Sequence, residues 1–287
     1  MKILFYILTI LPIGLIKLLF VAYSYLGLHK RSRAFKVTKK NLEIAYPELD
    51  SIQIMRLSTS SIIETLLSGY ESFQSWSRPI HISGKKIYRI ENNHLLSRNI
   101  VNRQGLIVIA IHNRSVDMLL KFINSKTSTT TLYKQIKNKK LDSFVRSQRE
   151  DNESKTYETS IAGVRQIYKA LMLNKVICLA ADQVPQDGMG EYIKLFNRDA
   201  YTTTLATSLA IKTSKPVIYI CMNSFSNNML GVTIKACSKD IYDDSKHKLS
   251  MNKDIENLIN INPKDYSWEY KRFKKPQTGI DNPYLSI

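Results

Sequence analysis

The sequence predicts an α/β protein, in which a mixed, largely parallel sheet is flanked by helices and preceded by an N-terminal membrane helix. Beyond Pro79, short runs rich in β-branched residues alternate with stretches whose apolar residues recur at helical spacing, which is typical of a sheet covered on both faces. The first 28 residues are mostly apolar, and the 287-residue chain can bury a full core. We therefore expect a membrane-anchoring helix over 1–28 and one large domain over 29–287.

The N-terminal segment is apolar over residues 3–28, interrupted by Pro12 and Lys17. About 20 apolar residues suffice to cross a bilayer core. A cleaved signal peptide, with a small-x-small pattern at 22–24, is the competing interpretation, but Lys17 lies inside its apolar region. A basic cluster follows the segment and favours the cytoplasmic side: Lys30, Arg31, Arg33, Lys36, Lys39 and Lys40. We expect a retained anchor, either spanning or interfacial; a buried helix pair split at Pro12 is the alternative.

The remaining elements follow in order. Apolar residues at helical spacing predict a long amphipathic helix over 51–76: Ile54, Leu57, Ile62, Ile63, Leu66 and Leu67. Strands are expected over 106–111, 129–133, 175–181 and 216–222, with helices over 139–150, 160–174 and 202–214. Reactive groups in such sheets gather just past the carboxyl ends of strands. His112 and Asp182 both fall there.

Charge and cysteine content limit the partners and the compartment. The formal net charge of +18 predicts an acidic partner. The candidates are nucleic acid, an anionic membrane surface and an acidic protein. The three cysteines have no CxxC spacing and an odd count, which argues against a disulfide framework or zinc site and indicates buried thiols in a reducing compartment. No nucleic-acid-binding signature is present, so we expect no nucleic-acid partner.

His112 and Asp117 form the most specific local pattern, in the stretch GLIVIAIHNRSVDMLL (105–120). Residues five apart on one α-helix are rotated by about 140° and do not meet. Contact between His112 and Asp117 therefore requires a turn, and residues 113–115 are of types that favour loops. Ser115 or a neighbour would cap a helix whose first turn holds Asp117. The Asp117 carboxylate would then face back toward His112.

A histidine held by a carboxylate is a general base. No G-x-S-x-G nucleophile motif accompanies the pair, so the base would activate a hydroxyl of a substrate. From the pattern alone, the alternative stays open that His112 is a structural loop histidine and Asp117 a favourable charge at a helix N-terminus.

His-x4-Asp at a strand-to-helix junction resembles the signature of the membrane glycerolipid acyltransferases. Nearly the whole chain resembles one related branch, the late acyltransferases of lipid A biosynthesis, which are lauroyl and myristoyl transferases of the Gram-negative inner membrane. The resemblance is carried by LPIGLIKLL (11–19), KKNLEIAYPEL (39–49), NKKLDSFVRSQRE (138–150), the Asp-Gln segment within 178–217, and INPKDYSWEYKRFKKP (261–276).

The resemblance implies a glycerolipid-acyltransferase-like fold with the acyltransferase domain over 29–287. It implies transfer of an acyl group from acyl-acyl carrier protein to a hydroxyl of a lipid A precursor, at the cytoplasmic face of the bacterial inner membrane. His112 would be the base and Asp117 its orienting carboxylate, while Arg149, Asp182 and Gln183 would bind substrate. Neither a cofactor nor a metal is implied. Acyl carrier protein, the lipid A precursor and anionic membrane lipids would be the partners.

Three alternatives are kept open. One is a lysophospholipid or other glycolipid O-acyltransferase that uses acyl-CoA or acyl carrier protein. Another is an inactive adaptor of the same fold, against which the presence of both His112 and Asp117 argues. The third is a nucleic-acid-binding protein, which the charge alone suggests and which explains neither the apolar N-terminal segment nor the ordered motifs. The sequence also departs from the family pattern. Asp117 stands where the family usually has glutamate, residues 113–116 differ from its glycine, asparagine and tryptophan, and Asn197 replaces a glycine. A divergent acceptor or reduced activity would follow from these departures.

Overall fold

The computed structural model describes residues 6, 7, 9–151 and 153–287. The helices are α2 (Ile13–Tyr25), α3 (Arg33–Ala45), α4 (Ser51–Ser77), α5 (Ile80–Ser83), α6 (Asn93–Asn102), α7 (Val116–Asn124), α8 (Lys139–Arg149), α9 (Ile161–Met172), α10 (Leu205–Thr213) and α11 (His247–Ile259). The strands are β1 (Ile87–Glu91), β2 (Leu106–Ala110), β3 (Thr129–Tyr133), β4 (Lys155–Glu158), β5 (Val176–Ala180), β6 (Gly190–Leu195), β7 (Arg198–Thr203), β8 (Val217–Ser224) and β9 (Leu230–Ala236).

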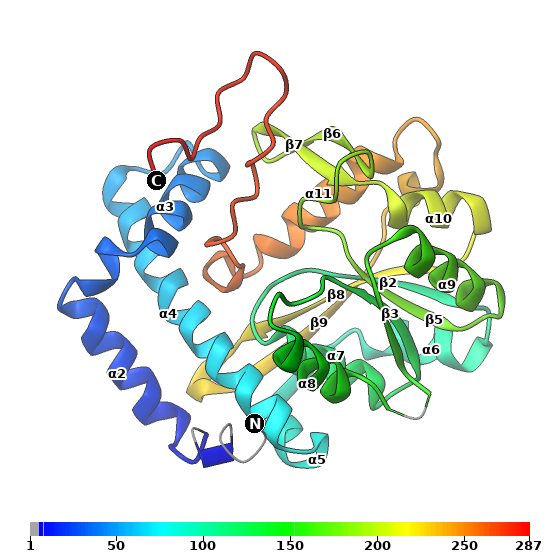
Figure 1. Ribbon diagram of the computed structural model, residues 1–287, viewed down its shortest axis with the longest axis horizontal. Coiled ribbons are helices and arrows are strands. Elements are labelled where there is room, and N and C mark those ends of the chain that lie inside the picture. Colours follow the sequence, from blue (N-terminus) through cyan, green and yellow to red (C-terminus); the bar gives the residue numbers. More distant parts are fainter. Residues whose placement is uncertain (1–5, 8, 152) are drawn as a thin grey trace.

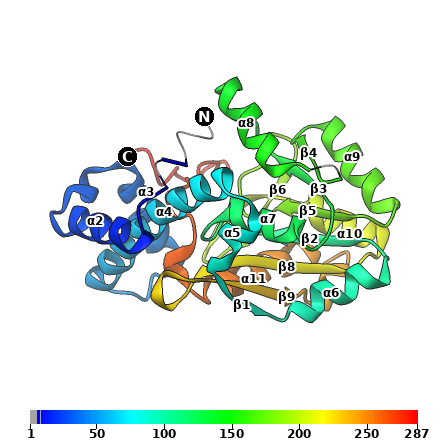
Figure 2. The ribbon, with the colours of Figure 1, turned by 90° about the horizontal axis from the view of Figure 1, so that it is seen from below.

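Seven strands of the described part of the chain form one sheet in the order β1-β9-β8-β2-β5-β3-β4 (Figures 1 and 2). Every neighbouring pair is parallel except β8 with β9, and β6 and β7 form a separate antiparallel hairpin. The predicted mixed, largely parallel sheet is confirmed. The β2 and β5 strands are in-register neighbours at its centre, with Ala110 opposite Ala180.

Successive side chains of the central strands enter two different cores, because side chains alternate between the faces of a strand. Ile107 and Ile109 of β2 pack in the core that contains residues of α9, α10 and α11. Leu106 and Val108 pack in the core that contains residues of α6 and α7. Both faces are therefore buried, which explains why the strands read as continuous apolar runs.

The predicted elements match the structure closely. The four expected strands are β2, β3, β5 and β8, and the helices expected over 139–150 and 160–174 are α8 and α9. The helix expected over 202–214 begins at Leu205, because Thr202 and Thr203 pair with β6 as the end of β7. The 51–76 helix is α4, which begins at a capping box of Asp50 and Gln53.

The N-terminal helices lie beside one end of the sheet (Figure 2). α2 begins after Pro12 and packs along α4 (Figure 1), where Ile16 contacts a small cluster with Leu67 and Tyr70. Part of the predicted anchor, residues 1–5 and 8, lies outside the described residues. In the described part of the chain, no helix has both the length and the apolar character needed to cross a membrane.

The C-terminal segment runs between the N-terminal helices and the sheet (Figure 1). Asn41 of α3 donates to the carbonyls of Trp268 and Tyr270. The backbone N–H of Ser267 donates to the carbonyl of His112 at 2.9 Å. This segment therefore packs directly behind the strand end that carries the histidine.

Candidate active site

His112 and Asp182 occupy equivalent places on adjacent strands. Each lies two residues past the last paired residue of its strand, which is Ala110 in β2 and Ala180 in β5. Because these strands are parallel and in register, their carboxyl ends deliver both side chains to the same edge of the sheet. The two residues meet although 70 positions separate them in the sequence.

The Asp182 carboxylate binds His112 at two atoms. Oδ2 accepts the backbone N–H of His112 at 2.7 Å, and Oδ1 lies 2.8 Å from ring atom Nδ1. An ionised carboxylate only accepts hydrogen bonds, so we assign the proton of the neutral ring to Nδ1 and the free lone pair to Nε2. Asp182 is 1% exposed and the His112 side chain 27%, so the carboxylate is shielded while the ring reaches solvent.

The expectation that Asp117 holds His112 is wrong: the carboxylate on the histidine belongs to Asp182. Asp117 does lie in the first turn of α7, as predicted. Its Oδ1 instead accepts Nε–H of Arg149, the last residue of α8, at 2.7 Å. Ser115 occupies the cap position, but its hydroxyl makes no capping bond and donates to Glu71. The carboxylate that contacts Nδ1 of His112 thus comes from the end of the neighbouring strand β5, and the Asp117 carboxylate contacts α8 instead.

Opposing effects set the charge state of the pair. Burial acts to lower the pKa of His112, but the negative charge of Asp182 and its hydrogen bond act to raise it. Glu269 also raises the pKa and Arg149 lowers it, and the net result is a pKa above the ordinary 6.5. Burial likewise opposes ionisation of Asp182, yet His112 holds the pKa of Asp182 below its ordinary value. The geometry therefore favours an ionised Asp182 and a His112 that is more basic than an ordinary histidine.

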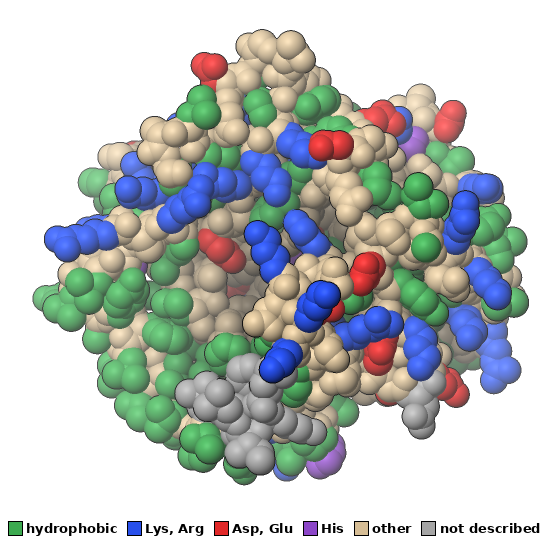
Figure 3. Space-filling view, viewed as in Figure 1, with side chains coloured by type: hydrophobic (Ala, Val, Ile, Leu, Met, Phe, Trp, Pro, Cys, Tyr) green, Lys and Arg blue, Asp and Glu red, His purple; other side chains and the backbone are tan. Residues whose placement is uncertain are grey.

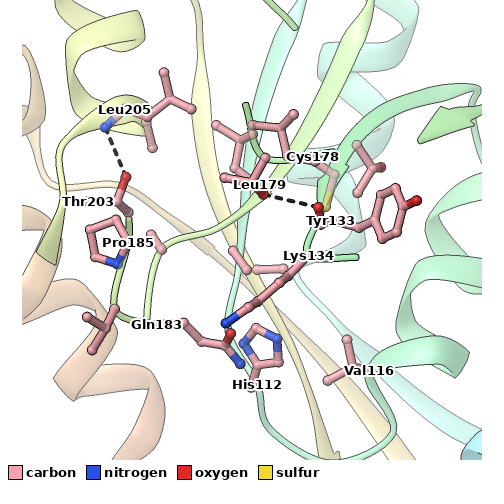
Figure 4. Close-up of a pocket in the computed structure, with 18 of the residues that line it drawn as sticks. His112, Val116, Tyr133, Lys134, Cys178, Leu179, Gln183, Pro185, Thr203 and Leu205 are labelled. Carbon is pink, nitrogen blue, oxygen red and sulfur yellow. Dashed lines mark hydrogen bonds between the residues drawn. The ribbon is translucent and has the colours of Figure 1, made fainter. Parts of the chain in front are cut away.

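A cavity of about 570 Å³ opens next to the ring. His112 and Gln183 lie side by side at one end of it, with Lys134 extending toward them, and Cys178 lies away from that end (Figure 4). Most of its other walls are apolar: Val116, Leu119, Leu120 and Ile123 of α7, Cys178 and Leu179 of β5, and Leu205 and Ala206 of α10. Such a volume and lining are typical of a small-molecule site with one polar end.

Cationic side chains contribute to the polar part of the lining. Arg149, Lys134, Lys274 and Lys275 all line the cavity. Lys275 is paired with Asp187, and the Lys274 amine lies 4.9 Å from the centre of the Tyr270 ring. On the face viewed in Figure 3, Lys and Arg side chains gather around a hollow. An anionic ligand with an apolar tail matches this combination of lining groups.

The structure brings three of the five predicted site residues into the cavity wall: His112, Arg149 and Gln183. The other two, Asp117 and Asp182, stand behind the wall, each bonded to one of those residues. Sequence reasoning missed the contact that Tyr270 makes beside Gln183. The Tyr270 hydroxyl accepts the backbone N–H of Val184, next to Gln183, at 3.1 Å. Nothing in the spacing of these residues signals that contact.

Comparisons with known proteins identify the family of the chain. The family model of bacterial lipid A biosynthesis acyltransferases matches residues 1–275. The chain is also similar to a lipid A biosynthesis lauroyltransferase of Escherichia coli (strain K12), with 20% identity over 279 residues that cover 96% of this chain and 90% of the relative. A match across almost the whole chain shows the family. The chain therefore belongs to the bacterial lipid A biosynthesis acyltransferases, and it is an O-acyltransferase.

Proposed function

We propose that this enzyme moves a fatty acyl group from the thioester of acyl-acyl carrier protein to a hydroxyl of a lipid A precursor, with His112 as the general base. The observation that carries the proposal is the His112–Asp182 pair at the polar end of an apolar cavity. The ring bond to Asp182 leaves Nε2 as the proton acceptor, and His112 lines the cavity where a substrate hydroxyl would lie.

The reaction needs one proton acceptor and one stabilised oxyanion. Nε2 of His112 takes the proton as the hydroxyl oxygen attacks the thioester carbon, and Asp182 stabilises the imidazolium that forms. The carbon–sulfur bond then breaks, an ester forms, and the imidazolium returns the proton to the departing sulfur. The guanidinium of Arg149, held by Asp117 at 2.7 Å, and the amide of Gln183 bind the substrate groups around the carbonyl.

The apolar part of the cavity accepts the acyl chain. Its aliphatic walls from α7 and α10 exclude water from the chain, and burial of each methylene contributes about 0.8 kcal/mol. The cationic part of the lining suits the phosphates of a lipid A precursor and an acidic carrier protein. The net charge of +18 favours binding of the lipid A precursor, the acidic carrier protein and the anionic membrane lipids alike.

The N-terminal region is proposed to bring the acyltransferase domain (29–287) to the cytoplasmic face of the inner membrane. α2 carries apolar side chains that stay exposed, such as Leu18 at 63% and Leu19 at 53%, and Figure 3 shows an apolar surface where α2 lies. The basic cluster over 30–40 follows directly. An apolar helix next to basic residues binds anionic bilayers in the interfacial plane, which is the mode we propose for residues 1–28.

The test is acyl transfer from radiolabelled acyl-acyl carrier protein to a tetra-acylated lipid A precursor. Wild type, His112→Ala and His94→Ala are assayed together, because His94 is an exposed histidine of α6 and serves as the matched control. We expect transfer by the wild type and by His94→Ala, and loss by His112→Ala. Equal transfer by all three would remove His112 from the mechanism. Transfer only to lysophospholipids, or only from acyl-CoA, would overturn the proposed substrates.

A further inference from the structure

Helix α4 has two differently used faces. Leu67 and Tyr70 pack against α2 through the small apolar cluster with Ile16. The adjacent face is polar. Glu64, Ser68 and Glu71 lie four and three residues apart, a spacing that places them on one side of the helix. We call these three residues the polar stripe of α4. All three contact the loop of residues 112–117.

Arg114 is held by both carboxylates of the polar stripe. Its Nε and Nη2 donate to the two oxygens of Glu71 at 3.0 and 2.8 Å, and Nη1 donates to Glu64. Arg114, Glu64 and Glu71 are each no more than 5% exposed. The second oxygen of Glu64 lies 3.3 Å from Nζ of Lys264. One buried guanidinium therefore binds two buried carboxylates, with bidentate geometry at Glu71, and the partly exposed Lys264 adds a second positive charge beside Glu64.

Ser115 is held by the same face. Its backbone N–H donates to Oγ of Ser68 at 3.0 Å, and its hydroxyl donates to Glu71. The backbone of Ser115 is left-handed, with φ at 50°, a conformation that a non-glycine residue keeps only where its surroundings impose it. The polar stripe supplies that restraint, and α7 begins at the next residue.

Stability alone is a weak reason for this cluster. Burying two carboxylates and a guanidinium costs desolvation that their attraction barely repays. What the cluster does achieve is geometric. We call the contacts of residues 114 and 115 with the polar stripe the clamp. His112 lies two residues before the clamp, and Asp117, the partner of Arg149, lies two residues after it. The clamp therefore restrains the positions of both side chains. The other side of the loop is held by Ser267, which donates to the His112 carbonyl.

We propose that Arg114 and Glu71 are positioning residues, which hold the loop of residues 112–117 so that His112 stays on Asp182 with Nε2 in the cavity. This inference rests on the proposed role of His112 as the base. The inference gives α4, which is distant from His112 in the sequence, a role in positioning the base. A displacement of a catalytic group by about 1 Å lowers rates by about 100-fold, so a loosened clamp is expected to act on turnover rather than on substrate binding.

The test compares Arg114→Lys, Glu71→Gln and Ser68→Ala with Arg89→Lys, the same substitution at an exposed ion pair in which Arg89 lies 3.2 Å from Glu91. Ser68→Ala removes one hydrogen bond and keeps all three buried charges, so it remains informative where a charge variant does not fold. kcat and KM for donor and acceptor are measured on folded protein, together with the pKa of His112 by NMR titration of its ring.

We expect kcat to fall by about 100-fold in Arg114→Lys and Glu71→Gln and by about 10-fold in Ser68→Ala, with KM nearly unchanged. The pKa of His112 should fall as its contact with Asp182 loosens, and Arg89→Lys should match the wild type in all three readouts. Folded clamp variants that keep the wild-type kcat and the wild-type pKa of His112 would overturn the inference, whatever their melting temperature. His112→Ala is run in parallel. If it stays active, the proposed function fails, while the NMR titration still decides whether the clamp positions the ring.

Discussion

Asp182 grips His112 at two points, accepting its backbone N–H at 2.7 Å and bonding its ring Nδ1 at 2.8 Å. The double contact fixes both the strand end and the ring orientation with one buried side chain. Asp182 and Asp117 therefore bind different partners: Asp182 binds His112, and Asp117 binds Arg149.

Because Asp117 contacts Arg149, Asp117→Asn and Arg149→Lys should disturb the same interaction. We expect each to lower kcat/KM, and the double variant to lose little more than the worse single variant, since partners in one contact are not additive. The pH at which activity is half-maximal should stay near that of the wild type in Asp117→Asn. Steady-state rates of the four proteins across pH test this. Additive losses, or a pH midpoint displaced in Asp117→Asn, would contradict the assignment.

Cys178 lies within β5, two residues before the strand end, and lines the apolar part of the cavity. Cys178→Leu should shorten the space for the acyl chain. The rate should then fall with donor length, by about fourfold for each methylene that no longer fits, since burial of one methylene contributes about 0.8 kcal/mol. Transfer from donors of increasing chain length is the measurement, with Cys178→Ala as the control that removes bulk. An equal loss for all chain lengths would show that the chain lies elsewhere.

The exposed apolar face of α2 should bind membranes. The Leu18→Glu, Leu19→Glu double variant is expected to lower partitioning onto anionic vesicles about tenfold or more, because each leucine loses its burial in the bilayer. Val101→Glu is the control, at a side chain that is 77% exposed on α6. Vesicle sedimentation at low and high salt separates the apolar from the electrostatic contribution. Undiminished binding by the α2 variant would refute interfacial docking.

Asp265 should make stability depend on pH. Burial raises the pKa of this carboxyl to about 6, from 3.8, with Glu64 adding to the rise. Between these two values the folded state binds more protons than the unfolded state, so this group lowers the free energy of unfolding as pH rises from about 4 to 6. The shift corresponds to about 3 kcal/mol at most.

Asp265→Asn removes this titration. The free energy of unfolding of the variant minus that of the wild type should therefore be more positive at pH 7.5 than at pH 4.5. Urea unfolding at both pH values measures this change, with Asp281→Asn as the control at an exposed carboxyl. A stability difference that is the same at both pH values would show that Asp265 does not titrate in this range.

Most of the sheet was predictable because its signals are local. The runs at 106–111 and 175–181 are apolar and β-branched, and they became the in-register neighbours β2 and β5. Their strand ends also identified the positions of His112 and Asp182. The pairing of these two residues was not predictable, because it depends on the order of strands in the sheet, which no local pattern specifies. A spacing of five residues made Asp117 look like the partner, yet the neighbouring strand filled that place.

The two uses of α4 show a second limit. Its apolar residues predicted the helix correctly, but the apolar spacing assigned no role to Glu64 and Glu71. Their burial becomes visible only when the loop that carries Arg114 is folded against them. Two glutamates seven residues apart among serines, in a helix that also carries apolar residues, are the one sequence signal for this role. Helical spacing predicts that they share a face, and it does not say that the face is buried.

The most direct test of the account is the pH dependence of acyl transfer by the wild type and by Asp182→Asn. The wild-type kcat/KM should rise with pH through a midpoint above 6.5, because His112 acts as a base only when neutral and its pKa is raised. Asp182→Asn should lose at least about 100-fold in kcat, and its midpoint should move to lower pH, because burial then lowers the pKa of the histidine without opposition from the carboxylate. A variant with the rate and the midpoint of the wild type would contradict the central claim that Asp182 holds His112 as the base.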